Sequence, residues 1–192
     1  MSTATPRRAQ LSYRRLPRRA LRPALDALYD ACGSTRRLTL AWDTTVVSRI
    51  YPGGRLERHL LDCAHAGEPV ANTPPTVMEV ARGLQATPAL AWFIRLLTSD
   101  LVEILSLDRA AAIVAGQLCA MHPSPPTGAR RKGVKPEQRA GWVLDIQIAA
   151  CAWTHGRDIA TENSREFEAL RELIAQLYPD TSPLLVKPPP TV

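Results

Sequence analysis

The sequence contains no long apolar run. No stretch approaches the ~18 consecutive apolar residues that a membrane-spanning helix requires. Arginines also interrupt the N-terminal segment, where a secretory signal peptide would carry an unbroken apolar core. These two absences predict a protein of the cytoplasm that has no membrane partner.

Cysteine is scarce, and several motifs with a known chemistry are missing. The cysteines are about thirty or more residues apart and form no CxxC pair, which argues against a zinc knuckle or a disulfide framework and predicts free thiols at Cys32, Cys63, Cys119 and Cys151. The sequence also lacks a glycine-rich phosphate loop, a dinucleotide-binding fingerprint, a G-x-S-x-G nucleophile elbow and an H-E-x-x-H pair. Functions that depend on those motifs are therefore not expected.

The chain is long enough for one domain with a substantial core. It has 192 residues, of which 45% are hydrophobic and 22% are charged. A domain of this size buries roughly 70% of the surface that its unfolded chain exposes. The composition differs from that of disordered or collagen-like chains, so a single folded domain is expected.

The positive charge is concentrated at the N-terminus. Residues 1–37 hold nine arginines and two aspartates, a net charge of +7, whereas the whole chain has a net charge of +6. The rest of the chain therefore sums to about −1. A basic N-terminal extension can contact phosphates through counterion release. The alternatives are a solvated, poorly ordered arm and a translation start further along the chain. Residues 17–32 can also form an amphipathic helix.

A second basic stretch covers residues 122–139. Its prolines and glycines predict a loop that ends at a new helix. Taken alone, its cations predict a solvated surface, an interpretation that the residues after the loop can change: Arg130, Arg131, Lys132, Lys135 and Arg139.

Apolar runs and turn residues predict alternating strands and helices. The strands are expected at residues 38–42, 68–73, 101–105, 157–161 and 183–186, and the helices at 46–51, 56–66, 74–84, 88–97, 109–120, 136–154 and 164–177. Strands separated by helices must pair in parallel and be covered on both faces. The pattern predicts an α/β fold, a three-layer α/β/α sandwich with a mainly parallel sheet of four or five strands, over residues 38–188, followed by a tail at 189–192.

Four carboxylates stand in apolar company. Asp43 directly follows the first strand, so it lies at the carboxyl edge of the sheet, where parallel α/β folds bind ligands. Glu79 lies inside the apolar helix after the second strand, and Asp145 interrupts the most apolar helix of the chain. Glu166 follows the fourth strand by one turn. Apolar surroundings cost a carboxylate free energy unless a cation or hydrogen bonds compensate.

Each of these acids has a structural explanation when it is taken alone. Asp43 can cap a helix, Glu79 and Glu166 can face water, and Asp145 can pair with Arg139. Together, they place three or four carboxylates near one edge of one sheet, and like charges that close require a divalent metal. Ligands that are all oxygen favour Mg²⁺ or Mn²⁺ over zinc.

The motifs follow one another in a recognisable order. They are Asp43-Thr44-Thr45, then Glu79 in a helix, then Asp145-x-x-Ile148-Ala149-Ala150-x-Ala152, and finally Ala160-Thr161-x-Asn163-x-x-Glu166-Phe167. Over residues 38–186 this pattern resembles PIN-domain ribonucleases of the VapC type, the toxins of type II toxin–antitoxin systems. Three features depart from the family: Glu166 stands where aspartate is more frequent, Glu162 stands where a basic residue is common, and the basic N-terminal extension has no counterpart.

The resemblance implies a Mg²⁺-dependent endoribonuclease in which a metal-activated water cleaves RNA. It implies that Asp43, Glu79 and Asp145 hold the metal and that Glu166 completes the catalytic set through a second metal or a water. Supporting hydrogen bonds are expected from Thr45, Thr161 and Asn163. The cations of the basic loop would hold the RNA backbone. The family also implies a cognate antitoxin protein as a partner, and assembly as a homodimer.

Two other functions compete with this hypothesis. One is a catalytically inactive PIN-like module that binds RNA or a protein. Intact acids at residues 43, 79 and 145 weigh against it, because relaxed selection would remove carboxylates that are costly to bury. The other is a small-molecule metallohydrolase, and the basic loop weighs against that function because its charge suits a polyanion better.

Overall fold

The computed structural model describes residues 40–85, 87–126 and 136–191. The basic N-terminal extension and the helix expected at residues 17–32 lie outside the described residues, and so do Cys32 and four of the five cations of the basic loop, Arg130, Arg131, Lys132 and Lys135. The predictions for these segments are not tested by the structure.

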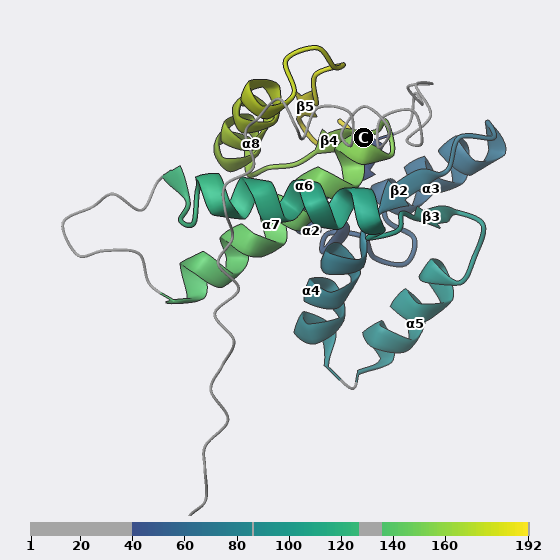
Figure 1. Cartoon of the computed structure of the whole chain (residues 1–192). Coiled ribbons are helices and arrows are strands. Elements are labelled where there is room, and N and C mark those ends of the chain that lie inside the picture. The colour runs from purple at the N-terminus through teal and green to yellow at the C-terminus, as the bar shows by residue number, and fades with distance from the viewer. Residues whose placement is uncertain (1–39, 86, 127–135, 192) are drawn as a thin grey trace, which may run out of the picture.

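Five short strands form one sheet in which every pairing is parallel (Figure 1). The strands are β1 (Leu40–Trp42), β2 (Val70–Asn72), β3 (Val102–Ile104), β4 (Asp158–Ala160) and β5 (Val186–Lys187). Their order across the sheet is β3-β2-β1-β4-β5. The parallel α/β fold predicted from the alternation of strands and helices is therefore confirmed.

Seven described helices connect the strands. They are α2 (Thr44–Val47), α3 (Arg55–His65), α4 (Pro74–Leu84), α5 (Pro88–Leu97), α6 (Arg109–Met121), α7 (Pro136–Thr154) and α8 (Ser164–Leu177). The prolines that open α4 occupy its first positions, where a missing N–H costs nothing, and the Thr73 side chain accepts a hydrogen bond from Thr76 N at 3.4 Å. This start of α4 agrees with the sequence-based expectation.

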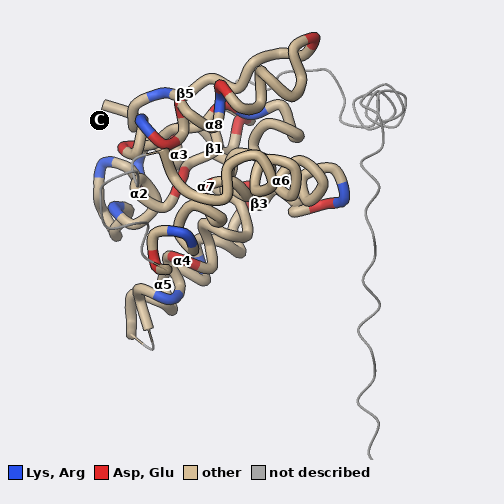
Figure 2. Tube along the Cα trace, turned by 60° about the vertical axis from the view of Figure 1, so that its left-hand side comes forward, with Lys and Arg blue, Asp and Glu red and all other residues tan. Residues whose placement is uncertain are grey.

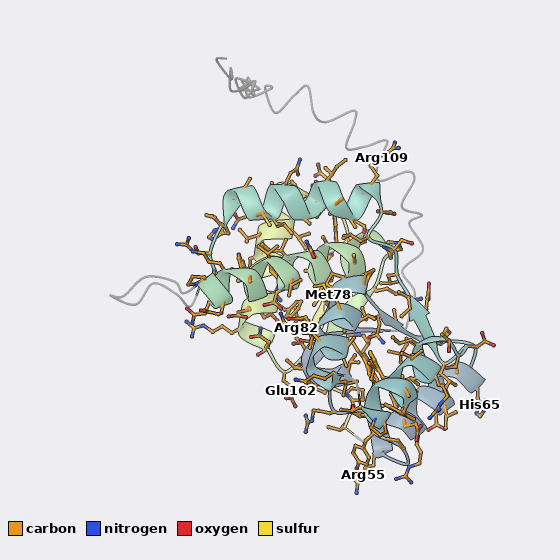
Figure 3. All side chains as sticks on the ribbon, turned by 90° about the horizontal axis from the view of Figure 1, so that it is seen from below. Arg55, His65, Met78, Arg82, Arg109 and Glu162 are labelled. Atoms are coloured by element: carbon orange, nitrogen blue, oxygen red, sulfur yellow. The ribbon has the colours of Figure 1, made fainter. Side chains whose placement is uncertain are left out.

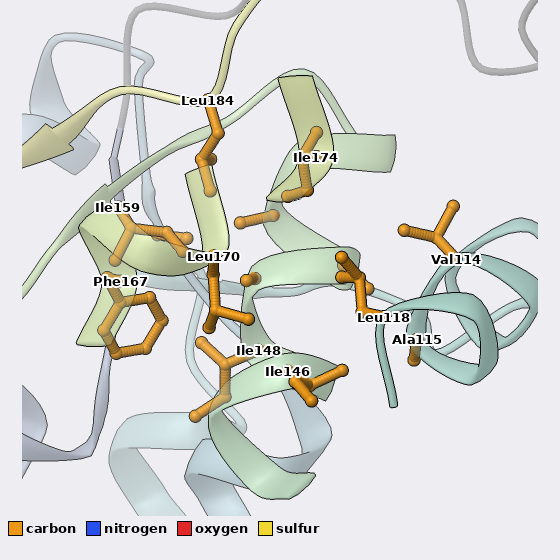
Figure 4. Close-up of a cluster of buried hydrophobic side chains, with 14 of the residues drawn as sticks. Val114, Ala115, Leu118, Ile146, Ile148, Ile159, Phe167, Leu170, Ile174 and Leu184 are labelled. Carbon is orange, nitrogen blue, oxygen red and sulfur yellow. The ribbon is translucent and has the colours of Figure 1, made fainter. Parts of the chain in front are cut away.

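Helices cover both faces of the sheet. Successive residues of each strand point to opposite faces, so neighbouring residues of one strand belong to different cores. Ala41 and Ile159 belong to a core formed with α6, α7 and α8, and Figure 4 shows Ile159 with residues of α7 and α8. The next residues along the strands, Trp42 and Ala160, belong to a second core formed with α3, α4 and α5. Two apolar cores on opposite faces make the three layers that were predicted.

Helix α7 is apolar because it is buried on nearly every side in its second half, from Ile146 to Thr154. It packs against α6 and α8 within one layer, and against α4 of the other layer. A carboxylate on this helix, Asp145, is consequently placed where two layers meet.

Two predicted boundaries were wrong. The helix expected at residues 46–51 is the single turn of α2, because the Asp43 side chain accepts hydrogen bonds from Thr45 N and Val46 N and so starts the helix directly after β1. The fifth strand was expected at residues 183–186, but β5 is Val186–Lys187. Leu184 is instead buried in the core before the strand begins.

Two further predictions concern thiols and the membrane. Cys63, Cys119 and Cys151 are free, and Cys151 is fully buried whereas the other two are half-buried. In the described part of the chain, no helix combines the length and the apolar character needed to cross a membrane.

Candidate active site

The candidate site lies where the chain reverses its direction across the sheet. After β1 the chain builds outward through β2 and β3, and it then returns to place β4 on the other side of β1. Parallel α/β sheets bind ligands at the carboxyl ends of strands beside such a switch point. Asp43 directly follows β1 and Thr161 directly follows β4, and Thr161 Oγ1 donates to Asp43 Oδ2 at 2.7 Å.

Asp43 is held by hydrogen bonds on both of its carboxylate oxygens. It is 2% exposed. Its Oδ1 accepts from Thr45 Oγ1 at 2.7 Å, from Thr45 N at 3.1 Å and from Val46 N at 3.2 Å. Burial raises the pKa of Asp43, and the hydrogen bonds from Thr161, Thr45 and Val46 oppose that rise. The helix-capping role considered for Asp43 is thus real, and it fixes the carboxylate at the site.

Glu79 and Glu166 each receive a hydrogen bond from a neighbouring polar residue. Thr44 Oγ1 donates to Glu79 Oε2 at 2.6 Å and thereby joins α2 to α4. Asn163 Nδ2 donates to Glu166 Oε2 at 2.5 Å. Both glutamates are half-buried. Of the predicted supporting residues, Asn163 therefore contacts Glu166, while Thr45 and Thr161 contact Asp43.

Asp145 is the carboxylate most affected by its surroundings. Burial is the main cause that raises its pKa to about 8, followed by the charge of Glu166 and a hydrogen bond with Glu166, and then by the charges of Glu79 and Asp43. The four predicted acids therefore face a common region. The alternative in which Asp145 pairs with Arg139 is not what the structure shows, because every group that shifts its pKa is an acid.

The acids carry the oxygen donors that Mg²⁺ or Mn²⁺ prefers, but they are not arranged as a closed metal cage. Within residues 40–85, 87–126 and 136–191, no three histidine, cysteine, aspartate or glutamate side chains are grouped so that they could hold a metal ion. The donor set still fits such a cation, because Asp145 is half-buried among acids and needs a proton or a cation to stay there. Red segments near the labels of α2, α4 and α7 mark acids in Figure 2.

Arg139 is the member of the predicted RNA-binding set that the structure describes. It lies in the first part of α7, six positions before Asp145, and it is exposed. Sequence reasoning missed Thr44 as a residue that positions Glu79. The signal was available, since Thr44 directly follows Asp43 and is polar at the first position of a helix. Contact with a helix that begins thirty positions later, however, could not be read from spacing.

The chain is similar to several solved structures over most of its length. The chain is similar to a chain in the DNA-bound VapBC structure from Salmonella typhimurium, with 22% identity and a TM-score of 0.48 over 79% of this chain and 98% of that chain. For VapBC-1 from nontypeable Haemophilus influenzae the identity is 15% and the TM-score 0.47, over 79% and 98%. For FitAcB from Neisseria gonorrhoeae they are 18% and 0.43, over 77% and 96%.

No family model matches the sequence, and no curated protein matches it. The fold class follows from the strand order, strand direction and layers of the chain itself.

Proposed function

We propose that the protein is a Mg²⁺-dependent endoribonuclease and acts as the toxin of a toxin–antitoxin pair. The observation that carries the proposal is the half-buried Asp145 carboxylate, whose neighbours at the carboxyl edge of the sheet are Glu166, Glu79 and Asp43. Acids that raise one another's pKa in this way are costly unless a proton or a cation offsets their repulsion. The same arrangement suits hydrolysis of a phosphodiester, where charge develops on the phosphate oxygens.

Asp43, Asp145 and Glu79 are the residues that would hold the ion, with Mn²⁺ as the alternative to Mg²⁺. When bound, the ion supplies a water of lowered pKa and neutralises the charge that develops on the scissile phosphate. Thr45 and Thr161 keep the Asp43 carboxylate in one orientation through hydrogen bonds to Oδ1 and Oδ2, respectively.

Glu166 and Glu79 complete the set from two different helices. Asn163 donates a hydrogen bond to Glu166, and Glu166 also forms a hydrogen bond with Asp145. Thr44 donates a hydrogen bond that orients Glu79. The candidate donors are therefore all carboxylate oxygens, each of them from Asp43, Glu79, Asp145 or Glu166.

The remaining parts of the proposal come from the resemblance of the motifs. The cations Arg130, Arg131, Lys132, Lys135 and Arg139 would hold the RNA backbone beside the acids. A cognate antitoxin protein would keep the enzyme inactive, and two copies of the chain would form a homodimer.

Incubation of the purified full chain with total cellular RNA, with and without Mg²⁺, tests the proposal. New RNA ends should form with Mg²⁺, and mapping them should show a restricted set of cut sites. A chain with Asp43→Asn is the matched control and should leave the RNA intact. Intact RNA with the wild type at every Mg²⁺ and Mn²⁺ concentration would favour the inactive binding module instead.

A further inference from the structure

Two exposed side chains of opposite charge meet beside the acids. Arg49 Nη1 and Glu162 Oε1 form an ion pair, and the two side chains are 58% and 47% exposed. Arg49 lies in the turn that follows α2, whereas Glu162 follows β4. The ion pair therefore joins the two loops that leave the carboxyl ends of β1 and β4.

The backbones on both sides of this ion pair are tied to the hydrogen bonds that orient Asp43. Glu162 N donates to Thr45 Oγ1 at 3.0 Å, and Thr45 Oγ1 donates in turn to Asp43 Oδ1. Arg49 N donates to Val46 O at 3.1 Å. The side chains, in contrast, extend into solvent, and Figure 3 shows Glu162 at the periphery of the fold. Their backbones are fixed, while their charged ends can exchange partners.

Arg49 carries a positive charge beside an edge of the sheet that is rich in acids. Asp43, Glu79, Asp145 and Glu166 would repel the phosphates of an approaching RNA. A guanidinium can bind phosphate oxygens with two parallel hydrogen bonds. An exposed ion pair contributes little net stability because water screens it, so a phosphate can replace a carboxylate on this guanidinium at small cost.

We infer that Arg49 contacts a phosphate of the RNA substrate and that Glu162 competes with this phosphate for the guanidinium. The inference rests on the proposed nuclease function and adds a specific substrate contact to it. Glu162 then acts as an internal substitute for the phosphate, which keeps Arg49 positioned at the site and lowers the affinity for RNA.

Binding of a labelled single-stranded RNA of mixed sequence to the full chain, measured in EDTA at several salt concentrations, tests this inference without cleavage. Arg49→Ala should weaken binding by on the order of 10-fold and reduce the log–log salt slope by ~0.7, the value of one lost phosphate contact on a single strand. Arg49→Lys should restore the slope and part of the affinity, because lysine keeps the charge but not the two-pronged geometry.

Glu162→Gln separates competition from a general charge effect. It should tighten RNA binding severalfold in the presence of Arg49 and have no effect in the Arg49→Ala protein. The ion pair between Arg171 and Glu168 on α8, with both side chains 39% exposed, supplies matched controls. Arg171→Ala and Glu168→Gln should leave affinity and salt slope unchanged.

The results that overturn the inference are distinct from those that overturn the proposed function. Equal affinity and slope for Arg49→Ala and wild type overturn it, and so does tightening by Glu162→Gln that persists without Arg49. If the wild type binds RNA through Arg49 but does not cut it with Mg²⁺, the nuclease proposal fails and the Arg49 contact stands. If the wild type binds no RNA, both fail.

Discussion

Replacement of Asp145 by asparagine should change how the stability of the metal-free protein depends on pH. Burial, together with the neighbouring acids, raises the pKa of Asp145 to about 8 from its ordinary value of 3.8. The folded chain therefore keeps a proton that the unfolded chain releases, and the free energy of unfolding of the wild type falls as pH rises through this window. Asparagine has the shape of the protonated acid but no proton to lose, so Asp145→Asn lacks this fall.

The expected magnitude follows from linkage. Each pH unit between the two pKa values costs the wild type ~1.4 kcal/mol relative to Asp145→Asn, so the gap between the proteins should widen by ~3 kcal/mol from about pH 5 to about pH 7. A change of this size is readily measured in proteins whose total stability is on the order of 5–15 kcal/mol.

Urea denaturation of both full-length proteins in EDTA, at several pH values, measures this gap directly. Titratable groups far from Asp145 keep the same pKa values in both proteins, so their contributions cancel in the difference. Addition of Mg²⁺ at neutral pH should stabilise the wild type more than Asp145→Asn. Stability curves that run parallel from about pH 5 to about pH 7 would refute the assignment of Asp145 to a crowded acidic site.

Three further predictions concern the proposed activity. Asp43→Asn should abolish Mg²⁺-dependent cleavage of cellular RNA while leaving the fold intact by circular dichroism, and expression of the wild type but not of this variant should slow growth; equal growth inhibition would point to another activity. Replacement of Arg130, Arg131 and Lys132 by alanine should weaken RNA binding and flatten its log–log salt slope by up to ~0.7 per lost phosphate contact, whereas an unchanged slope would mark the loop as solvated surface. A chain that starts near Thr35 should fold and cleave RNA, because β1 and all four acids lie beyond that point; a truncated chain that folds but cuts no RNA at low salt would show that the extension helps to build the site.

The sequence pattern was sufficient for the fold because each strand and each helix has its own local signal. The strand from Leu40 is apolar and ends at a polar cap, and α4 opens with two prolines. The direction of the strands followed from the helices between them. The length of α2 was overestimated, because a side chain that caps a helix sets its first residue but not its last.

The acids of the candidate site stand out in the sequence for a different reason. A carboxylate such as Asp145 interrupts an apolar segment, and such an interruption can be recognised from the sequence alone. The contact of Thr44 with Glu79 and that of Arg49 with Glu162 are not visible in this way. Each of these two contacts joins segments that are far apart in the sequence. Neither Thr44 nor Arg49 departs from the pattern of the segment in which it lies.

The burial of α7 has a consequence for when the site comes into existence. This helix contacts α4 in one layer and α8 in the other, and the acids of the site come from four separate segments, the last of them on α8. A chain still emerging from the ribosome without α8 has neither Glu166 nor the packing that confines Asp145. The four acids therefore come together only after α8 has been synthesised and has packed against α7.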